Sequence, residues 1–256
     1  MSSNIYNTEK IIKAPKSRLI GKNIIIREVV ESTSSFLKDA LTRGEVSSGT
    51  IAVANIQTKG YGRFKRKWVS PRGGIYLSFL IKRFKRDIAP LTLVIAYSVA
   101  NSLQYLTGIK PNLKWPNDIL VNDKKIGGVL AELVGDNLVC GVGVNINTEQ
   151  TALPEEIKER ATSLFIETGK KFDITDALLN LIQGIDKNLV IYKNKGFSYF
   201  RDRWLSLCPR WHDIIYPKIG QEKTVHLFHD ISETGALIIV DENGKKQLFS
   251  GEISYE

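Results

Sequence analysis

The chain has 256 residues, 43% of them hydrophobic and 25% charged, with a formal net charge of +9. This composition is ordinary for a soluble globular protein, and the length suits one medium domain with a small second one. No apolar stretch is long enough to span a bilayer, no secretory signal is visible, and Cys140 and Cys208 lack the C-x-x-C spacing of a metal site. We therefore expect a cytoplasmic protein with reduced thiols, whose excess of cations favours anionic partners.

The first half of the chain predicts strands that alternate with helices. Residues 1–20 contain Pro15, which discourages a long helix, and we expect a loosely held tail there. In the first predicted helix, Ser32 or Thr33 can act as the N-cap and Gly44 marks the end. The other expected elements are strands at 23–29, 50–57 and 74–82, and a buried helix at 87–106 that stops at Gly108.

The second half of the chain predicts hairpins, then helices, then a series of short strands. A turn at 116–118 is followed by tight hairpin turns at 122–123 and 135–137. From Trp211 onward, short strands separated by Gly, Asp and Asn turns are typical of a small barrel. This order predicts an α+β fold. The expected segments are helices near 154–168 and 175–192, and three parts of the chain: a tail (1–20), a main domain (21–208) and a C-terminal barrel (209–256).

A cationic loop, which we define as residues 59–74 (KGYGRFKRKWVSPRGG), carries six Lys or Arg side chains and no acid. Gly60 and Gly62 give the backbone freedom to hinge, and Trp68 lies in the middle of the loop. Two functions fit this pattern. One is a nucleic-acid-binding patch, and the other is a loop that folds over a small anionic ligand.

Four ordered motifs favour the second function. They are ESTS (31–34), GYGRFKRKW (60–68), KWPNDILVNDKKIGG (114–128) and GVGVNIN (141–147). Together they resemble the catalytic domain of biotin protein ligases, whose loop has the form G-R-G-R-x-G-R-x-W. The resemblance implies a mixed sheet with flanking helices, like that of class II aminoacyl-tRNA synthetases, in residues 21–208. It also implies an SH3-like β-barrel in residues 209–256.

The resemblance implies an ATP-dependent ligation in two steps. The carboxylate of biotin attacks the α-phosphate of ATP, which arrives with Mg²⁺, and the products are biotinyl-5′-AMP and pyrophosphate. A lysine amine of a biotin carboxyl carrier protein then attacks this mixed anhydride and releases AMP. Both steps build negative charge on oxygens, so fixed cations and backbone N–H groups are suitable equipment. The cationic loop is then expected to close over the polyphosphate and exclude water.

The resemblance also implies roles for individual residues. Lys125 and Arg63 are expected to be catalytic, since an ammonium and a guanidinium can neutralise carboxylate and phosphate together. Asp118 is a candidate Mg²⁺ ligand. The implied biotin-binding residues are Ser32, Thr33, Gln57, Gly60, Arg63, Lys125, Gly128, Gly141 and Gly143, and the implied ATP- or adenylate-binding residues are Arg63, Arg66, Trp68, Asn117, Asp118, Lys125 and Asn145.

Purely structural roles compete at several of these positions. Lys124 is the alternative to Lys125, although alternation along a strand points it the other way. The remaining alternatives are a helix cap for Ser32 or Thr33, turn chemistry for Asn117 and Asp118, core packing for Trp68, and a tightly packed strand for Gly141 and Gly143.

The cationic loop departs from the family pattern in two places. Tyr61 stands where an arginine is common, and Phe64-Lys65 replaces a pair that usually includes glycine. Lys65 is bulkier than glycine, so we expect the closed loop to differ in shape. Tight retention of the adenylate is the property that this change affects.

Other functions remain alternatives. Lipoate-protein ligases share the fold and the adenylation chemistry but lack the G-x-G-R-x-x-R-x-W loop. A basic nucleic-acid-binding module would explain the charge, yet the twenty residues before the first strand are too few for the winged-helix domain of repressor-type ligases. We therefore expect a short form without specific DNA binding. His226 and His229 should point to opposite faces of a strand, which does not suit a metal pair. Related ligases often form homodimers through a sheet edge.

Overall fold

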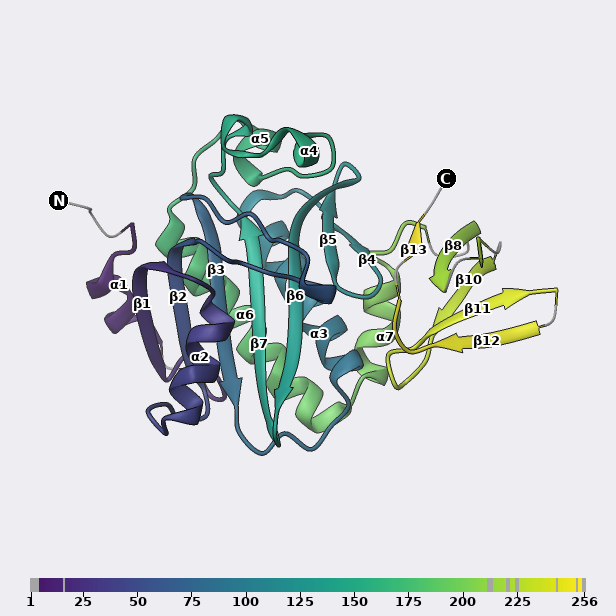
Figure 1. Ribbon diagram of the computed structural model, residues 1–256, viewed down its shortest axis with the longest axis horizontal. Coiled ribbons are helices and arrows are strands. Elements are labelled where there is room, and N and C mark those ends of the chain that lie inside the picture. The colour runs from purple at the N-terminus through teal and green to yellow at the C-terminus, as the bar shows by residue number, and fades with distance from the viewer. Residues whose placement is uncertain are drawn as a thin grey trace.

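The structure is a computed structural model that describes residues 5–15, 17–210, 214–219, 222–223, 226–242, 244–251 and 253–254. A seven-stranded sheet forms its centre, in the order β1-β2-β3-β7-β6-β5-β4 (Figure 1). β1 runs parallel to β2, and the other neighbouring strands are antiparallel. The strands are β1 (Asn23–Val30), β2 (Thr50–Gln57), β3 (Gly74–Ile81), β4 (Asn112–Lys114), β5 (Asp118–Val121), β6 (Lys124–Val134) and β7 (Asn137–Asn145).

Helices cover both faces of this sheet. α2 (Thr33–Thr42) lies on one face, and α3 (Ile88–Thr107) and α6 (Ile174–Lys195) pack together on the other (Figure 1). α3 is buried around most of its circumference, as its sequence predicts, and ends where Gly108 adopts a left-handed conformation. Strand β3 is buried on both faces because helices cover both, so its side chains do not divide into a core face and a solvent face. Within the described residues, no helix has both the length and the hydropathy needed to cross a membrane.

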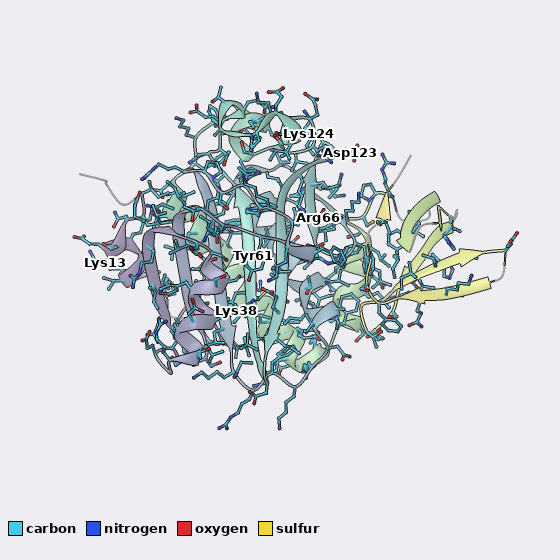
Figure 2. The ribbon with its side chains drawn as sticks, in the orientation of Figure 1. Lys13, Lys38, Tyr61, Arg66, Asp123 and Lys124 are labelled. Atoms are coloured by element: carbon cyan, nitrogen blue, oxygen red, sulfur yellow. The ribbon has the colours of Figure 1, made fainter. Side chains whose placement is uncertain are left out.

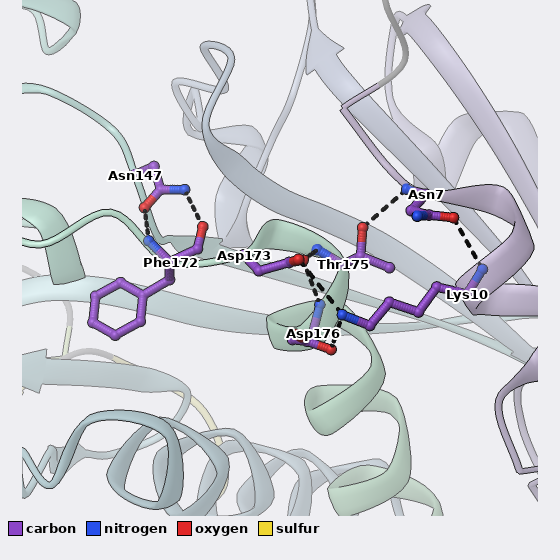
Figure 3. A network of polar contacts seen from close by, with 7 residues as sticks. All are labelled: Asn7, Lys10, Asn147, Phe172, Asp173, Thr175 and Asp176. Atoms are coloured by element: carbon purple, nitrogen blue, oxygen red, sulfur yellow. Dashed lines mark hydrogen bonds and ion pairs between the residues drawn. The ribbon is translucent and has the colours of Figure 1, made fainter.

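The N-terminal segment docks against α6, so the prediction of a loosely held tail is wrong for its described residues. Helix α1 (Thr8–Lys13) lies beside the first turn of α6, and Tyr6 is buried. Figure 3 shows the contact: the backbone N–H of Asn7 donates to Thr175, and the Lys10 ammonium lies 2.6 Å from Asp176.

Asp186 holds the end of the same N-terminal segment. This carboxylate, on the buried side of α6, accepts hydrogen bonds of 2.6–2.9 Å from three successive backbone N–H groups of residues 18–20. A buried carboxylate needs such donors. These contacts join positions more than 160 residues apart, so local sequence pattern does not reveal them.

The helices predicted near 154–168 are present but short. The segment at 150–168 forms a 3₁₀ turn (Gln150–Ala152), α4 (Glu155–Lys158) and α5 (Leu164–Thr168), separated by extended backbone. The physical reason is pairing with β6: the N–H of Lys125 donates to the carbonyl of Arg160, and the N–H of Thr162 donates to the carbonyl of Lys125. Helix α7 (Ser198–Leu205) follows α6 and was not predicted.

The C-terminal strands form a second, antiparallel sheet, ordered β12-β11-β10-β8-β13 with β9 paired to β8. Its buried residues join the core behind the large sheet, and the indole N–H of Trp115 donates to the carbonyl of Gly235. The α+β fold class with a small C-terminal β-domain is therefore confirmed, although Trp211, where the barrel was predicted to begin, lies outside the described residues. The strands are β8 (Ile214–Ile219), β9 (Glu222–Lys223), β10 (His226–Ile231), β11 (Leu237–Asp241), β12 (Gly244–Leu248) and β13 (Ile253–Ser254).

Candidate functional site

A cavity of about 550 Å³ lies on the α2 side of the large sheet, over β6 and β7. Its size is that of a small-molecule site. The N-terminus of α2 forms one end, and the cationic loop crosses in front of β7 and β6 (Figure 1). All the predicted site residues except Gly60 line it: Ser32, Thr33, Gln57, Arg63, Arg66, Trp68, Asn117, Asp118, Lys125, Gly128, Gly141, Gly143 and Asn145.

Gly60 does not line the cavity, but it packs closely against residues that do. A Cβ atom at this position would stand 2.7 Å from the carbonyl oxygen of Trp68 and 2.9 Å from the amide nitrogen of Gln57. Any side chain would therefore collide with the backbone of Trp68. The structure supports a requirement for glycine here, but by close packing within the protein.

A hydrogen-bonded polar cluster closes the α2 end of the cavity. The carbonyl oxygen of the Gln57 side chain accepts from both the backbone N–H and the hydroxyl of Thr33, at 2.8 and 3.1 Å. The Gln57 amide donates to Ser70. Ser78, which the sequence reasoning missed, is buried and lies 2.8 Å from the Thr33 hydroxyl. The signal was available: Ser78 interrupts the apolar strand β3 directly opposite Gly141.

Ser32 is a helix cap in the structure. Its hydroxyl accepts from the backbone N–H of Ser35 at 3.4 Å, and its backbone is extended, as an N-cap requires. It also lines the cavity. Both roles considered for this residue are therefore compatible with its position.

Trp68 packs flat against the backbone of β7. A Cβ atom on Gly143 would stand 2.7 Å from two atoms of the indole, and one on Gly128 would stand 3.6 Å from it. These two glycines are paired across β6 and β7. The backbone at Gly143, an implied biotin-binding residue, therefore carries the Trp68 indole, because only glycine leaves room for a ring there. The indole N–H is buried without a partner among the described residues.

Lys125 is aimed into the cavity by local backbone geometry. Asn122 and Asp123 both have positive φ, the conformation of a tight two-residue hairpin turn between β5 and β6. A bulge then shifts the register between Ile119 and Leu120. The Lys125 ammonium lies 2.6 Å from Asp118 and 5.4 Å from the centre of the Trp68 ring.

Lys124 does not line the cavity, as alternation along β6 predicts. Figure 2 places it with Asp123 at the upper end of the sheet, above the labelled loop residues. This contrast makes Lys124 a control position for Lys125.

Asn117 braces the strand beside it. Its side-chain amide donates to the carbonyl of Val129 at 2.9 Å, and the N–H of Val129 returns a bond of 3.1 Å to the carbonyl of Asn117. This favours the structural role that was considered for Asn117. Asp118 presents a carboxylate to the cavity, and Asp123 also lines it.

The carboxylates fit Mg²⁺ that arrives on a polyphosphate. Among the described residues, no group of three or more His, Cys, Asp or Glu side chains could hold a metal by itself. Mg²⁺ bound to nucleotide phosphates needs only one or two protein carboxylates. Asp118 can supply one, once it shares or leaves its contact with Lys125.

Asn145 offers a buried acceptor at the cavity wall. Its amide donates to the carbonyl of Thr162 at 2.9 Å, which fixes the orientation of the side chain. Its carbonyl oxygen has no partner among the described residues, and the residue is 4% exposed. An unpaired buried acceptor is costly, and a ligand N–H would satisfy it.

The cationic loop is a short hairpin rather than an open coil. Gly62 donates its N–H to the carbonyl of Arg66, and Tyr61 forms a β-bridge with Lys67. Arg66 lies on the cavity side, near the centre of the view in Figure 2. Arg63 also lines the cavity and donates to the backbone carbonyl of Gly251 at 2.8 Å, which links the loop to the C-terminal sheet.

Part of the cavity wall was not predicted. Leu153, Ile157, Arg160 and Ala161 form it on the side of the broken helical segment, and Ile253 contributes from β13. No motif marks these residues, so the sequence assigned none of them to the site. Lys114 and Trp115, by contrast, belong to a motif that the sequence already singled out.

Comparisons with known proteins agree with this geometry. Residues 26–148 match the model of the "Biotin/lipoate A/B protein ligase family". The chain is 30% identical to the bifunctional ligase/repressor BirA of Escherichia coli, over 98% of this chain and 78% of that protein. It is 29% identical to a biotin–[acetyl-CoA-carboxylase] ligase of Mycobacterium tuberculosis, over 92% of this chain and 91% of that protein.

The fold also matches a solved structure closely. A biotin protein ligase from Aquifex aeolicus, in complex with biotin and ATP, superposes with a TM-score of 0.82 and 40% sequence identity. The match covers 91% of this chain and 98% of that one.

Proposed function

This chain belongs to the biotin protein ligase family, and from that membership we propose that it activates biotin with ATP and transfers it to a lysine of a biotin carboxyl carrier protein. The observation that carries the proposal for this cavity is the placement of Lys125. Its ammonium enters from one wall, while Arg63 and Arg66 of the cationic loop line the same space. Such a site can bring two anions into contact.

The first step joins two negatively charged reactants. A carboxylate oxygen of biotin attacks the α-phosphorus of ATP, the bond to the β-phosphate oxygen breaks, and pyrophosphate leaves. Lys125 neutralises both reacting groups, and Arg63 and Arg66 bind the carboxylate and the phosphates in bidentate fashion. Mg²⁺ adds positive charge on the polyphosphate when it arrives with ATP, and Asp118 is the residue suited to contact it.

The second step transfers the acyl group. The lysine amine of the carrier attacks the acyl carbon of biotinyl-5′-AMP, an amide bond forms, and AMP leaves as the anhydride bond breaks. The cationic loop keeps water from the anhydride until the carrier arrives. Asn145 and Trp68 bind the adenylate in this proposal, with the unpaired oxygen of Asn145 available for a nucleobase N–H.

The polar end of the cavity favours biotin over lipoate. A urea has one acceptor and two N–H donors, and the cluster of Ser32, Thr33 and Gln57 presents hydroxyl and amide groups to match them. The dithiolane ring of lipoate has no such groups. Gly141 and Gly143 would carry the flat biotin ring, which requires the Trp68 indole to move from Gly143.

The assembly of the protein is part of the proposal. We propose that two copies form a homodimer through a sheet edge, for which β1 offers an outer strand with Val29 51% exposed. We further propose that the protein acts in the cytoplasm and that its net charge of +9 produces only salt-sensitive, sequence-independent contacts with DNA. Light scattering tests the dimer. DNA binding that depends on sequence and survives high salt would contradict the last point.

The test of function is mass spectrometry of an acceptor protein. The purified protein is incubated with Mg·ATP, an acceptor carrier domain, and either biotin or lipoate. We expect a biotinyl adduct on one lysine of the carrier and none from lipoate. A lipoyl adduct favours the lipoate ligase, and a carrier that stays unmodified with both acids refutes the proposal.

A further inference from the structure

Four side chains meet on the outer side of the cationic loop, and we call them the loop clasp: Lys38, Tyr61, Lys65 and Glu132. They come from α2, from the loop itself and from β6. Figure 2 shows Lys38 and Tyr61 close to one another in front of the sheet. Of the four, only Tyr61 also lines the cavity.

Glu132 is the centre of the clasp. One of its carboxylate oxygens accepts from the Tyr61 hydroxyl at 3.0 Å and lies 2.8 Å from the Lys38 ammonium. Lys38 also donates to the Tyr61 hydroxyl at 3.0 Å, so the three groups close a triangle. The Lys38 and Glu132 side chains are only 24% and 23% exposed, which shields the pair from solvent far more than an ordinary surface ion pair.

Lys38 keeps its positive charge at neutral pH. Burial alone would lower the pKa of Lys38, but hydrogen bonds to Glu132 and Tyr61 outweigh burial and hold the pKa above its ordinary value. Lys38 is therefore an ammonium, with Glu132 and Tyr61 as its hydrogen-bond partners.

Lys65 connects the clasp to the unusual turn of the loop. Its ammonium lies 4.3 Å from the centre of the Tyr61 ring and 3.8 Å from Glu132. Both Phe64 and Lys65 have positive φ, 54° and 56°, which is unfavourable for residues with a Cβ atom. A glycine would adopt this conformation freely and leave the loop flexible. Here side-chain contacts hold the turn.

The hairpin transmits this anchoring to the cavity. The β-bridge between Tyr61 and Lys67 and the bond from Gly62 to Arg66 tie the two arms of the loop together. Fixing Tyr61 therefore restrains the backbone that carries Arg66. A loop that is already in place loses less conformational freedom when it closes over a ligand.

We propose that the loop clasp positions the cationic loop over the cavity and thereby slows the escape of the adenylate. Glu132 is the positioning residue, since it contacts the loop and not the cavity. The inference rests on the proposed function, because the retained species is biotinyl-5′-AMP. It gives a role to Tyr61 and Lys65, the two positions where the loop departs from the family pattern.

Two measurements test the clasp in the full-length protein. The first is tryptic cleavage, located by mass spectrometry: the loop has six Lys or Arg sites, and this readout needs no activity. The second is the release rate of biotinyl-5′-AMP formed on the enzyme. The variants are Glu132→Gln and Tyr61→Phe, where the second removes a single oxygen and preserves folding if the first does not. Glu31→Gln is the matched control, because it breaks only an exposed pair between Glu31 and Lys59 of the same loop.

The expected result is faster cleavage confined to the loop, together with adenylate release raised about tenfold in Glu132→Gln and a few-fold in Tyr61→Phe, the scale of a hydrogen bond to a charged group. Glu31→Gln should match the wild type in both. Three results would overturn the proposal. The loop could be cut at the wild-type rate in both clasp variants, or cleavage could rise throughout the chain. The third result is a loop that is cut faster while the release rate of the adenylate stays unchanged. A wild-type protein that forms no adenylate refutes the proposed function instead, and the cleavage comparison still decides whether the clasp holds the loop.

Discussion

Replacing Lys125 by methionine should remove most of the adenylation activity without unfolding the protein. Methionine keeps an aliphatic side chain over Gly128, which the end of Lys125 approaches closely. It removes only the ammonium. The Asp118 carboxylate loses its partner at 2.6 Å, but the Asp118 side chain is 26% exposed and water can solvate it.

The size of the effect follows from the geometry. Two unit charges about 4 Å apart interact by about 4 kcal/mol at the effective dielectric constant of a partly exposed site. The Lys125 side chain is 34% exposed and already faces Asp118, so only part of that energy is available to the transition state. We expect a loss of about 3 to 4 kcal/mol, or roughly 10²- to 10³-fold in rate, which is typical for one preorganised donor.

The assay is biotin-dependent pyrophosphate release in a single turnover with Mg·ATP. Lys124→Met is the matched control, since Lys124 neighbours Lys125 but does not line the cavity. It should stay within a few-fold of the wild type. A Lys125→Met protein that releases pyrophosphate at a near-wild-type rate, with an unchanged unfolding curve, would refute the assignment of Lys125.

Three further predictions follow from other contacts. The fluorescence of Trp68, taken as the difference between the spectra of the wild type and Trp68→Phe, should change when biotin binds, because the biotin ring and the indole compete for Gly143. A difference spectrum that stays the same at saturating biotin contradicts this. Asp186→Ala should lower the free energy of unfolding by about 3 kcal/mol in urea titrations, because three buried N–H groups lose their acceptor, and a loss below about 1 kcal/mol would show that water replaces the carboxylate. The pKa of Asp173 is lowered, mainly by the backbone N–H of Asp176 and then by that of Thr175. The stability that the Asp173 carboxylate contributes is therefore present above its unfolded pKa of about 3.9 and is lost as pH falls through its folded pKa. The stability gap of about 0.5 kcal/mol between wild type and Asp173→Asn should therefore close as the pH falls below about 3.9 and through the folded pKa of Asp173. A gap that stays constant with pH argues against the charge.

Local pattern predicts the central elements well. The strand predicted at 50–57 is β2, with the same bounds, because an apolar run is framed by Gly49 and the cationic loop. The turn at Asn122-Asp123 is also as predicted, since these residue types tolerate the positive φ that a tight hairpin needs. The α+β order and the four motifs together indicate the fold class and the family.

Long-range contacts account for what the pattern missed. The N-terminal segment docks because Asp186 and Thr175 on α6 accept its backbone N–H groups, and neither partner is visible in the segment itself. The interruption between α4 and α5, within the helical segment predicted near 154–168, depends on pairing with Lys125 on β6. The predicted residues that line the cavity carry motifs, whereas the wall that includes Arg160 carries no motif.

The position of Trp68 shows a limit of a different kind. The sequence implied that Trp68 binds the adenylate and that Gly143 binds biotin. It could not indicate that the two meet, because either a ligand ring or the indole fits the same surface. Choosing between them requires coordinates.

The most direct test of this account is a crystal structure of the protein with biotin and ATP bound. We predict biotinyl-5′-AMP in the cavity, with the ring on Gly141 and Gly143, Trp68 displaced from Gly143, and the Lys125 ammonium within hydrogen-bonding distance of the acyl phosphate. Electron density for the intermediate elsewhere on the molecule, or a Lys125 side chain directed into solvent, would contradict it.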